Sequence, residues 1–395
     1  MTPSNTTTKP ERGLTAALAP TYRRPETLFV AGRGAWLEDD QGQRFLDMTS
    51  GIAVNALGHG ASEIAEVLRE GADGLIHVSN LYHTLPAIEL AEALVARSFA
   101  TQVFFANSGS EANEGAIKFA RLAAGDDRRE VVHFGGSFHG RTFASLAATD
   151  RPDYKQPFEP LPPGFRRAEW NDASALEAID RRTALVMLEP IQGEAGIRVP
   201  STEWVRAVRA RCDEVGALLL FDEVQCGLGR TGKLFAYQGL GVEPDLLTLA
   251  KPLAGGLPMG AILLGEKLAN TVRPGCHGTT FGGGPLVAKV ALRVLTTIDR
   301  PAFLAAVDER GQHFQAALGE LAGVTEVRGR GLMIGAVVPN VADVVAAAFD
   351  ERLLVVPAGK EVVRFLPPLN VTEEEIDEAA TRFQRALART ATTTR

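Results

Sequence analysis

The chain has 395 residues, 45% of them hydrophobic and 23% charged, so it can bury a large core and is not disordered as a whole. Its net charge of −7 provides no basic footprint, which argues against nucleic-acid binding. No apolar run approaches the ~20 residues that span a bilayer. The three cysteines are widely spaced and form no CxxC pair, which favours a reduced, intracellular protein.

The first thirteen residues, MTPSNTTTKPERG, are polar and rich in threonine and proline. They lack the apolar segment of a signal peptide and are too short and too poor in cations for a transit peptide. We therefore expect a disordered lead-in and a cytoplasmic protein. Further along, a polar turn at 39–42 predicts a hairpin over Trp36–Leu46, and apolar spacing predicts helices over Glu63–Leu75 and Pro86–Arg97.

From Gln102 onward, short apolar runs alternate regularly with glycine-bearing loops and helical segments. Strands are predicted at Gln102–Ala106, Val131–Phe134, Ala184–Leu188, Ala217–Phe221, Leu246–Ala250 and Ala261–Leu264. Because their apolarity is continuous rather than alternating, both faces should be buried, as in a parallel sheet covered by helices. Helices are expected at Glu111–Ala123 and at Trp204–Val215, whose apolar face would place Cys212 in the core.

The pattern changes after residue 285. Helices are predicted at Pro285–Ile298 and Ala302–Leu321, strands near Leu332–Val338 and Val362–Leu366, and a last helix from Thr372, which has capping-box spacing to Glu375. These elements indicate a smaller α+β domain that the N-terminal hairpin would join. We therefore expect a segment 1–60 that joins the small domain, a large domain 61–285 and a small C-terminal domain 286–395.

Two of the predicted strands end in charged residues. Ligands of open α/β sheets bind at the carboxyl ends of the strands. Lys251 ends one apolar strand, where desolvation would lower its pKa and favour Schiff-base chemistry, although a salt bridge explains this stretch equally well. Asp222 ends another, where a buried carboxylate needs a partner such as a protonated ring nitrogen or a nearby arginine.

Other strand ends carry groups suited to anions or to a flat ring. Gly109 and Ser110 open a helix, where free N–H groups form either an anion cradle or a simple N-capped turn. Phe138 could stack on a ring, and Arg141 could bind a carboxylate bidentately. His139 suggests a general base, but a histidine packed in a loop is the more common case.

The remaining candidates lie in loops and in one strand of the small domain. Glu194 could reach the mouth of the site or be a solvated loop carboxylate, and Thr279 and Thr280 could contact a phosphate or carboxylate. Arg364 interrupts an apolar strand, either pointing outward from an edge strand or serving as a carboxylate-binding arm. The histidines show neither i, i+4 pairing nor HExxH, so no metal site is expected.

Seven motifs, in order, resemble the class-III, or ω-amino-acid, pyridoxal-phosphate aminotransferases over nearly the whole chain. They are NSGSEANEGAIKFAR, FHGRT, EPIQGE, LLLFDEVQCGLGRTG, LAKPLAGGLPMGA, HGTTFGG and VVRFLPPL. The resemblance implies the α/β type I aminotransferase fold: a large, mostly parallel, seven-stranded-type sheet domain with helices on both faces and a smaller α+β domain. It also implies a homodimer with active sites at the subunit interface.

The resemblance further implies a cofactor, pyridoxal 5′-phosphate, and its contacts. These are Gly109, Ser110, Phe138, Asp222, Gln225, Lys251 and, from the other subunit, Thr280. Lys251 would form the covalent link to the cofactor and later move protons, while Asp222 would pair with the pyridine nitrogen. Phe138 would stack on the ring and Gln225 would touch its 3-hydroxyl group.

The same resemblance implies the substrate contacts. Arg141 and Thr279 would bind the far end of the amino donor, Arg364 the α-carboxylate of 2-oxoglutarate, and Glu194 would cover Arg364 while the donor is bound. SFHGRT and GIAVNALGHG are most similar to the members that act on N-acetylornithine in arginine biosynthesis. Ornithine, succinylornithine, 4-aminobutyrate and carrier-linked lysine remain alternative donors, and a glutamate-semialdehyde aminomutase remains another activity. A cofactor-free Schiff-base lyase or a binding protein would leave Asp222 unexplained.

Overall fold

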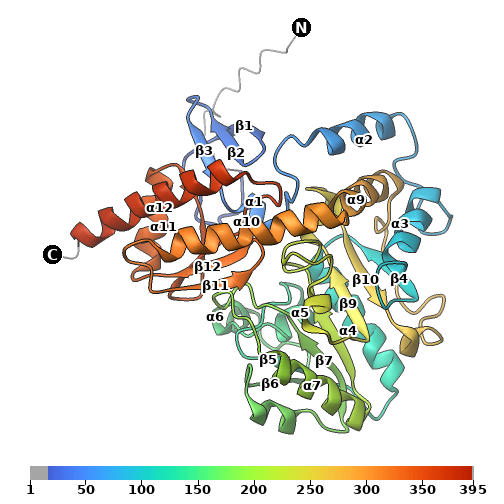
Figure 1. Ribbon diagram of the computed structural model, residues 1–395. Coiled ribbons are helices and arrows are strands. Elements are labelled where there is room, and N and C mark those ends of the chain that lie inside the picture. The colour runs from blue at the N-terminus through green and yellow to red at the C-terminus, as the bar shows by residue number, and fades with distance from the viewer. Residues whose placement is uncertain (1–16, 394–395) are drawn as a thin grey trace.

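A computed structural model describes residues 17–393 of the chain (Figure 1). The lead-in predicted for residues 1–13 lies outside these residues. Three sheets organise the described part: one of seven strands and two of four strands each. In this part no helix is both long and apolar enough to cross a membrane.

The seven-stranded sheet has the order β4-β10-β9-β8-β7-β5-β6. Its strands are β4 (Gln102–Ala106), β5 (Glu130–Phe134), β6 (Phe165–Ala168), β7 (Thr183–Leu188), β8 (Leu218–Asp222), β9 (Leu246–Leu249) and β10 (Gly260–Leu264). All six predicted strands are confirmed, with ends that differ by at most one residue. The sheet is parallel except for β10, which runs antiparallel to both neighbours. Strand β6 was not predicted, because its sequence FRRA contains no apolar run.

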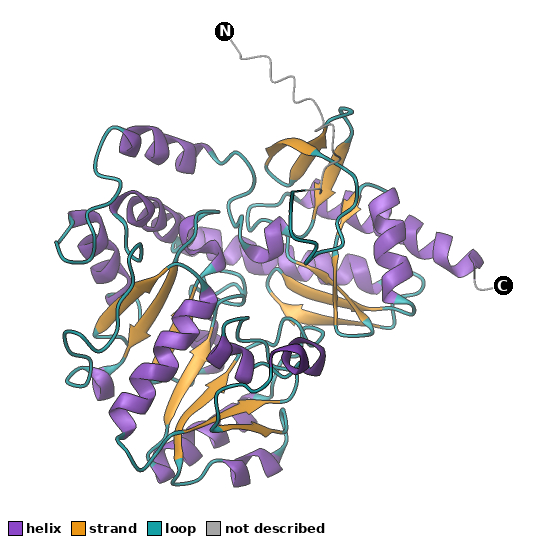
Figure 2. Ribbon diagram, turned by 180° about the vertical axis from the view of Figure 1, so that it is seen from behind, coloured by secondary structure: helices purple, strands orange, loops and turns teal. Residues whose placement is uncertain are grey.

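Helices cover both faces of this sheet (Figure 2). The helices of this region are α2 (Ser62–Ala72), α3 (Leu85–Val95), α4 (Gly109–Ala124), α5 (Phe143–Ala147), α6 (Pro152–Lys155), α7 (Thr202–Val215), α8 (Ala236–Leu240) and α9 (Pro285–Ile298). Of these, α2 packs against α9 rather than on the sheet. Short 3₁₀ turns are η1 (Gln156–Phe158), η2 (Ala173–Ala178), η3 (Lys251–Ala254) and η4 (Glu266–Leu268). On one face α4 packs Ala116 and Phe119 against the strands, and on the other α7 buries Trp204 and Cys212. The core position expected for Cys212 is confirmed.

The smaller region combines both ends of the described chain. One sheet joins β1 (Phe29–Arg33), β2 (Trp36–Asp39) and β3 (Arg44–Asp47), the predicted hairpin, to β13 (Leu353–Leu354); the other has the order β11 (Glu326–Arg330), β12 (Met333–Val337), β15 (Val362–Phe365), β14 (Val356–Ala358). The helices here are α10 (Pro301–Gly319), α11 (Val341–Asp350) and α12 (Glu373–Thr393); a short turn, α1 (Ser50–Ala53), follows β3. The predicted capping box is present, since Thr372 and Glu375 each accept the other's backbone N–H through their side chains.

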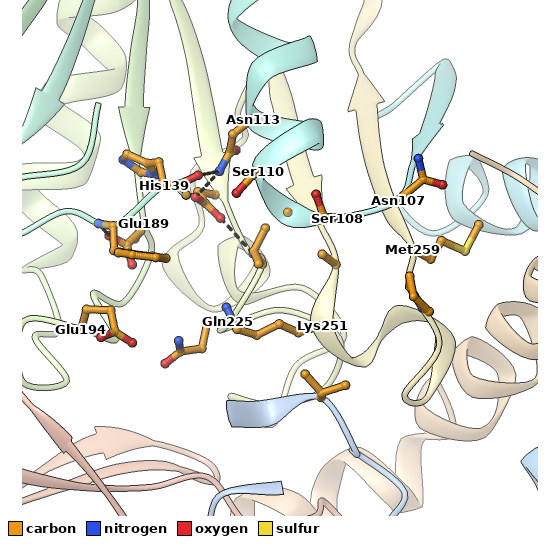
Figure 3. Close-up of a pocket in the computed structure, with 18 of the residues that line it drawn as sticks. Asn107, Ser108, Ser110, Asn113, His139, Glu189, Glu194, Gln225, Lys251 and Met259 are labelled. Atoms are coloured by element: carbon orange, nitrogen blue, oxygen red, sulfur yellow. Dashed lines mark hydrogen bonds and ion pairs between the residues drawn. The ribbon is translucent and has the colours of Figure 1, made fainter. Parts of the chain in front are cut away.

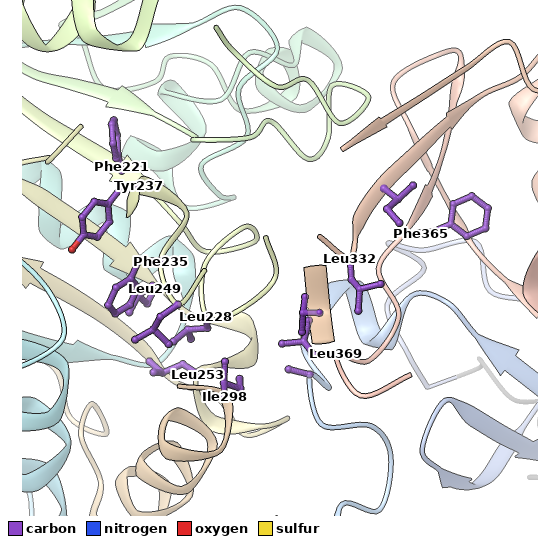
Figure 4. Packing of buried hydrophobic residues seen from close by; sticks show 14 of the residues in the cluster. Phe221, Leu228, Phe235, Tyr237, Leu249, Leu253, Ile298, Leu332, Phe365 and Leu369 are labelled. Atoms are coloured by element: carbon purple, nitrogen blue, oxygen red, sulfur yellow. The ribbon is translucent and has the colours of Figure 1, made fainter. Parts of the chain in front are cut away.

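One hydrophobic core crosses the boundary between the two regions. Leu228 and Ile298 lie on one side of this seam, and Leu332 and Leu369 face them from the other (Figure 4). Arg364 lies on β15, between β12 and β14, and its side chain is only 2% exposed. The interpretation of Arg364 as an outward-pointing residue of an edge strand is therefore wrong. The strand instead brings a buried guanidinium to the seam.

His133 on β5 predicts a pH dependence of stability. Burial, with a smaller contribution from His139, lowers its pKa from 6.5 to about 3. Since the folded state binds this proton more weakly than the unfolded chain, the stability it contributes is complete above pH 6.5 and is lost as the pH falls toward 3. Between pH 6.5 and 5 the wild type should lose up to about 1.4 kcal/mol per pH unit relative to His133→Leu. Thermal midpoints measured across this range test it; a constant difference between the two proteins would contradict it.

Candidate active site

A cavity of about 320 Å³ lies at the carboxyl ends of the central strands (Figure 3). The first turn of α4 and the segments that follow β5, β7, β8 and β9 line it, together with Val54 after α1. Parallel strands bring these segments to one edge of the sheet, although they are far apart in the sequence. The cavity therefore collects most of the residues that the sequence marked as candidates.

Lys251 stands where β9 gives way to η3. Its φ of 38° lies in the left-handed region, which is strained for a residue with a side chain and is typical of functional sites. The side chain extends into the cavity toward Gln225 (Figure 3), and within residues 17–393 nothing hydrogen-bonds or ion-pairs with its Nζ. Burial lowers the pKa of Lys251, with Asp222 opposing the effect. Lys251 therefore has no salt-bridge partner in the described chain, and its amine is available as a nucleophile.

Asp222 is buried at the end of β8 and is held by a network of hydrogen bonds. Its Oδ2 accepts from Asn113 Nδ2 and from His139 Nδ1, both at 2.7 Å, and its Oδ1 accepts from the Val224 backbone N–H at 3.1 Å. Asn113 is itself oriented by the Thr248 hydroxyl, which donates to Asn113 Oδ1 at 2.8 Å. No arginine pairs with Asp222 among the residues described, so the alternative of a structural arginine partner is not met.

His139 belongs to this network rather than acting as a free base. Burial lowers its pKa, but the hydrogen bond and charge of Asp222 outweigh that effect and raise the pKa above 6.5 overall. Its Nε2 is buried without a partner in the described chain. The structural interpretation of His139 is therefore the better one, since the ring fixes the position of the carboxylate.

The first turn of α4 is N-capped and also leaves backbone N–H groups free at the cavity, so its geometry suits an anion. Ser108 caps the helix through a hydrogen bond from the Glu111 N–H, while the N–H groups of Gly109 and Ser110 have no intrahelical partner. A Cβ at Gly109 would lie 2.8 Å from Val224 Cγ1, so only glycine fits without displacement. The Ser110 hydroxyl accepts from the Arg141 N–H at 3.2 Å and can still donate into the cavity.

Phe138 also lines this cavity, and a buried glutamate holds its backbone. The Phe138 N–H donates to Glu189 Oε1 at 2.9 Å. Burial raises the pKa of Glu189 to about 7, against the opposing charge of His139. Glu189 therefore fixes the loop that carries Phe138.

Arg364 reaches across the seam from β15 toward the cavity. Its Nη1 donates to Glu194 Oε1 at 2.7 Å and to Gln225 Oε1 at 3.0 Å, while its Nε is buried without a partner in the described residues. Glu194 and Gln225 both line the cavity. A carboxylate thus covers a buried guanidinium at the edge of the space that holds Lys251.

Besides Arg364, three candidates lie outside the cavity lining. Arg141 is exposed, with its guanidinium carbon 3.5 Å from the centre of the Tyr154 ring. Thr279 Oγ1 accepts from Asn107 Nδ2 at 3.1 Å, which places it beside the cavity. Thr280 lines a different cavity, next to Tyr82 and Ile88. Within one chain, therefore, Thr280 is not part of the Lys251 site.

Comparison with known proteins decides the family. A sequence model of the aminotransferase class-III family matches residues 18–387. The chain belongs to this family. An acetylornithine aminotransferase from Alnus glutinosa, described as mitochondrial, is 49% identical over 92% of this chain and 84% of its own length. An acetylornithine aminotransferase from Methanocaldococcus jannaschii is 46% identical over 90% of this chain and 92% of its own length.

Solved structures of other class-III aminotransferases share the fold. The N-acetylornithine aminotransferase of Stenotrophomonas maltophilia K279a is 38% identical, covers 94% of this chain and 98% of its own, and superposes with a TM-score of 0.81. The ornithine aminotransferase of Toxoplasma gondii ME49 is 30% identical, with coverages of 95% and 94% and a TM-score of 0.90. Another structure of the Toxoplasma gondii enzyme contains pyridoxal phosphate at partial occupancy in its active site. The expected fold, a large mostly parallel sheet with a smaller domain, is confirmed.

Two polar residues of the site went unpredicted. Asn113 and Thr248 orient Asp222. Asn113 could have been found, because it is a polar residue on a helix face otherwise made of buried alanines (Ala112, Ala116 and Ala120). In residues 17–393 no group of three or more histidine, cysteine, aspartate or glutamate side chains is placed to hold a metal ion.

Proposed function

We propose that this chain is a pyridoxal-phosphate-dependent aminotransferase of arginine biosynthesis. It would transfer the terminal amino group of N2-acetyl-L-ornithine to 2-oxoglutarate, giving N-acetyl-L-glutamate 5-semialdehyde and L-glutamate. The observation that carries the mechanism is the unpaired Lys251 amine, which shares one cavity with Asp222 and with the free N–H groups of α4. The acetylornithine aminotransferases at 44–49% identity support the choice of donor.

The residues of the cavity fit pyridoxal phosphate. The N–H groups of Gly109 and Ser110 suit its phosphate, and the buried Asp222 carboxylate, held by Asn113 and His139, suits a protonated ring nitrogen. Phe138 supplies an aromatic face. When bound, pyridoxal phosphate would supply an electron sink for the bonds of the substrate carbon that carries the transferred amino group. Gln225 would lie beside the 3-hydroxyl group of the ring.

Lys251 would perform two tasks in each half-reaction. Its amine would hold the cofactor between turnovers, and, once displaced by substrate, would carry a proton to and from the substrate carbon. Burial favours both tasks, because it lowers the pKa of Lys251 and increases the fraction of free base near neutral pH. Asn113 and His139 would keep Asp222 in place while charge moves through the ring.

Arg364 and Glu194 would let one site accept two different substrates. With 2-oxoglutarate present, Arg364 would bind its α-carboxylate and Glu194 would move aside. With acetylornithine present, Glu194 would return to the 2.7 Å contact seen here and neutralise Arg364, so that no cation faces the donor's amine end. Arg141 and Thr279 would bind the far end of the donor.

An apolar surface supports the proposal of a homodimer. Six hydrophobic side chains of segment 75–88, and Phe281 beside them, are exposed in the single chain: Leu75, Ile76, Leu81, Tyr82, Leu85 and Ile88. Part of this surface lines the cavity that contains Thr280. A patch of this kind marks an interaction site, and a second copy that covers it could bring Thr280 to the partner's cofactor phosphate.

The dimer gives a direct prediction. In sedimentation the wild type should have twice the 42.2 kDa mass of the chain. Leu81→Arg should sediment as a monomer, because it places a charge in the apolar surface that a second copy would cover. It should bind pyridoxal phosphate more weakly, because the partner's Thr280 would then be missing from the site. The single chain should still fold, since Leu81 is 84% exposed. Phe158→Arg, an exposed apolar residue outside the patch, serves as the control. A wild type that stays monomeric at micromolar concentration refutes the proposal.

The donor is tested by single-turnover kinetics of the cofactor-loaded enzyme. Acetylornithine, succinylornithine, ornithine and 4-aminobutyrate are each mixed with it, and conversion of the cofactor is followed by absorbance. Acetylornithine should give the highest ratio of rate constant to apparent dissociation constant. A higher ratio for any of the other three amines would reassign the donor without changing the cofactor or fold.

A further inference from the structure

A second cavity lies at the other end of α4 from the Lys251 site. It has a volume of about 550 Å³ and contains the side chains of Lys118 and Arg121 from α4, of Arg129 before β5, and of Arg273 after η4. Nine residues line this cavity, and we call them the basic groove: Lys118, Phe119, Arg121, Leu122, Arg129, Arg273, Pro274, Gly275 and Cys276. The groove does not depend on the reaction proposed for Lys251, since it shares none of that cavity's lining.

Three of the four cations of the basic groove have no carboxylate partner in the described part of the chain. In the described part of the chain only Arg129 forms an ion pair, with Asp126, whose side chain is 97% exposed. Arg121 donates to two backbone carbonyls, those of Arg129 and Pro163, at 2.9 and 3.2 Å. Lys118 Nζ lies 2.8 Å from His277 Nδ1 rather than near a carboxylate. A chain of net charge −7 thus gathers four cations around one hollow, and in residues 17–393 a single, exposed carboxylate pairs with one of them.

Repulsion between Arg121 and Arg129 also indicates that the groove lacks a compensating negative charge. Burial lowers the pKa of Arg121, and the neighbouring charge of Arg129 lowers it further. Phe165 supports the Arg121 guanidinium from its ring face at 5.3 Å, so that the guanidinium is held in place. An anion that enters the groove would relieve this repulsion. Arginine forks and a lysine around one concavity suit phosphate oxygens.

We propose that the basic groove binds a small polyvalent anion of the phosphate class. The volume is that of a small-molecule site rather than of a track for a polymer. The overall acidic charge also disfavours a polyanionic macromolecule. A short stretch of chain links the groove to the Lys251 site. Thr279 follows Cys276 of the groove by three residues and accepts a hydrogen bond from Asn107, which lines the active cavity.

Inorganic pyrophosphate is the probe, and the protein is loaded with pyridoxal phosphate so that the cradle of α4 is already filled. Isothermal titration at constant ionic strength should show saturable binding to the wild type. Arg273→Gln should weaken that binding about tenfold, which corresponds to one charge-assisted hydrogen bond. Arg273 is exposed, and its side chain forms no hydrogen bond or ion pair within residues 17–393, so this variant should fold normally. Arg181→Gln, which removes an exposed arginine outside the groove, should bind like the wild type.

Hydrogen exchange locates the site independently of any variant. Pyrophosphate should slow amide exchange in residues 273–277 and leave residues 176–182, around Arg181, unchanged. Absence of saturable binding, equal weakening by Arg273→Gln and Arg181→Gln, or protection confined to the N-terminus of α4 would each overturn the proposal.

Discussion

Replacing Lys251 with alanine should abolish turnover and remove the visible absorption band of the protein loaded with pyridoxal phosphate. Lys251 points into the cavity, and no other lysine among the described residues lines it, so no second amine is placed to replace it. Loss of a positioned proton carrier alone costs up to about 10⁴-fold in rate. Loss of the covalent attachment should lower the rate further. The measurement is single-turnover conversion of acetylornithine, followed at the wavelength of the bound cofactor.

Two controls separate this role from a structural one. Lys233→Ala removes an exposed lysine outside the cavity and should retain both the band and the activity. Thermal midpoints should show that Lys251→Ala is at least as stable as the wild type without cofactor, because the variant no longer has to bury an amine without a partner. A Lys251→Ala protein that keeps the absorption band would refute the attachment, and with it the class of reaction.

Most of the sheet could be predicted from the sequence, because continuous apolarity in a strand indicates directly that both of its faces are buried. Runs such as Leu246–Leu249 are apolar on both faces, and that pattern admits few alternatives to a covered sheet. Apolarity does not indicate strand direction. The antiparallel direction of β10 was therefore not predicted, since its apolar run is like those of the parallel strands. The apolar pattern also did not predict β6, where arginines occupy a strand at the edge of the sheet.

Site residues at strand ends were predictable for a similar reason, and their partners were not. Lys251 and Asp222 stand out as charges after apolar runs, whereas the bonds from Asn113 and His139 to Asp222 connect residues 109 and 83 positions apart. Such contacts follow from how α4 and the loop after β5 cross the sheet, which no local pattern encodes. The same limit applied to Arg364, whose burial depends on the strands on either side of β15.

Substitutions of Arg364 and of Glu194 should slow opposite half-reactions. Arg364→Ala removes the proposed partner of the 2-oxoglutarate α-carboxylate and leaves Glu194 unpaired, so the acceptor half-reaction should slow by at least about 100-fold, the usual result of truncating a buried charge pair. Glu194→Gln leaves the guanidinium uncovered. It should therefore impair the acetylornithine half-reaction more than the acceptor half-reaction, because an uncompensated cation then faces the donor. Arg330→Ala, on β11 of the same sheet, is the matched control for the loss of an arginine. Single-turnover spectra of both half-reactions decide the matter, since equal losses in the two directions would show that the pair is structural and does not switch between substrates.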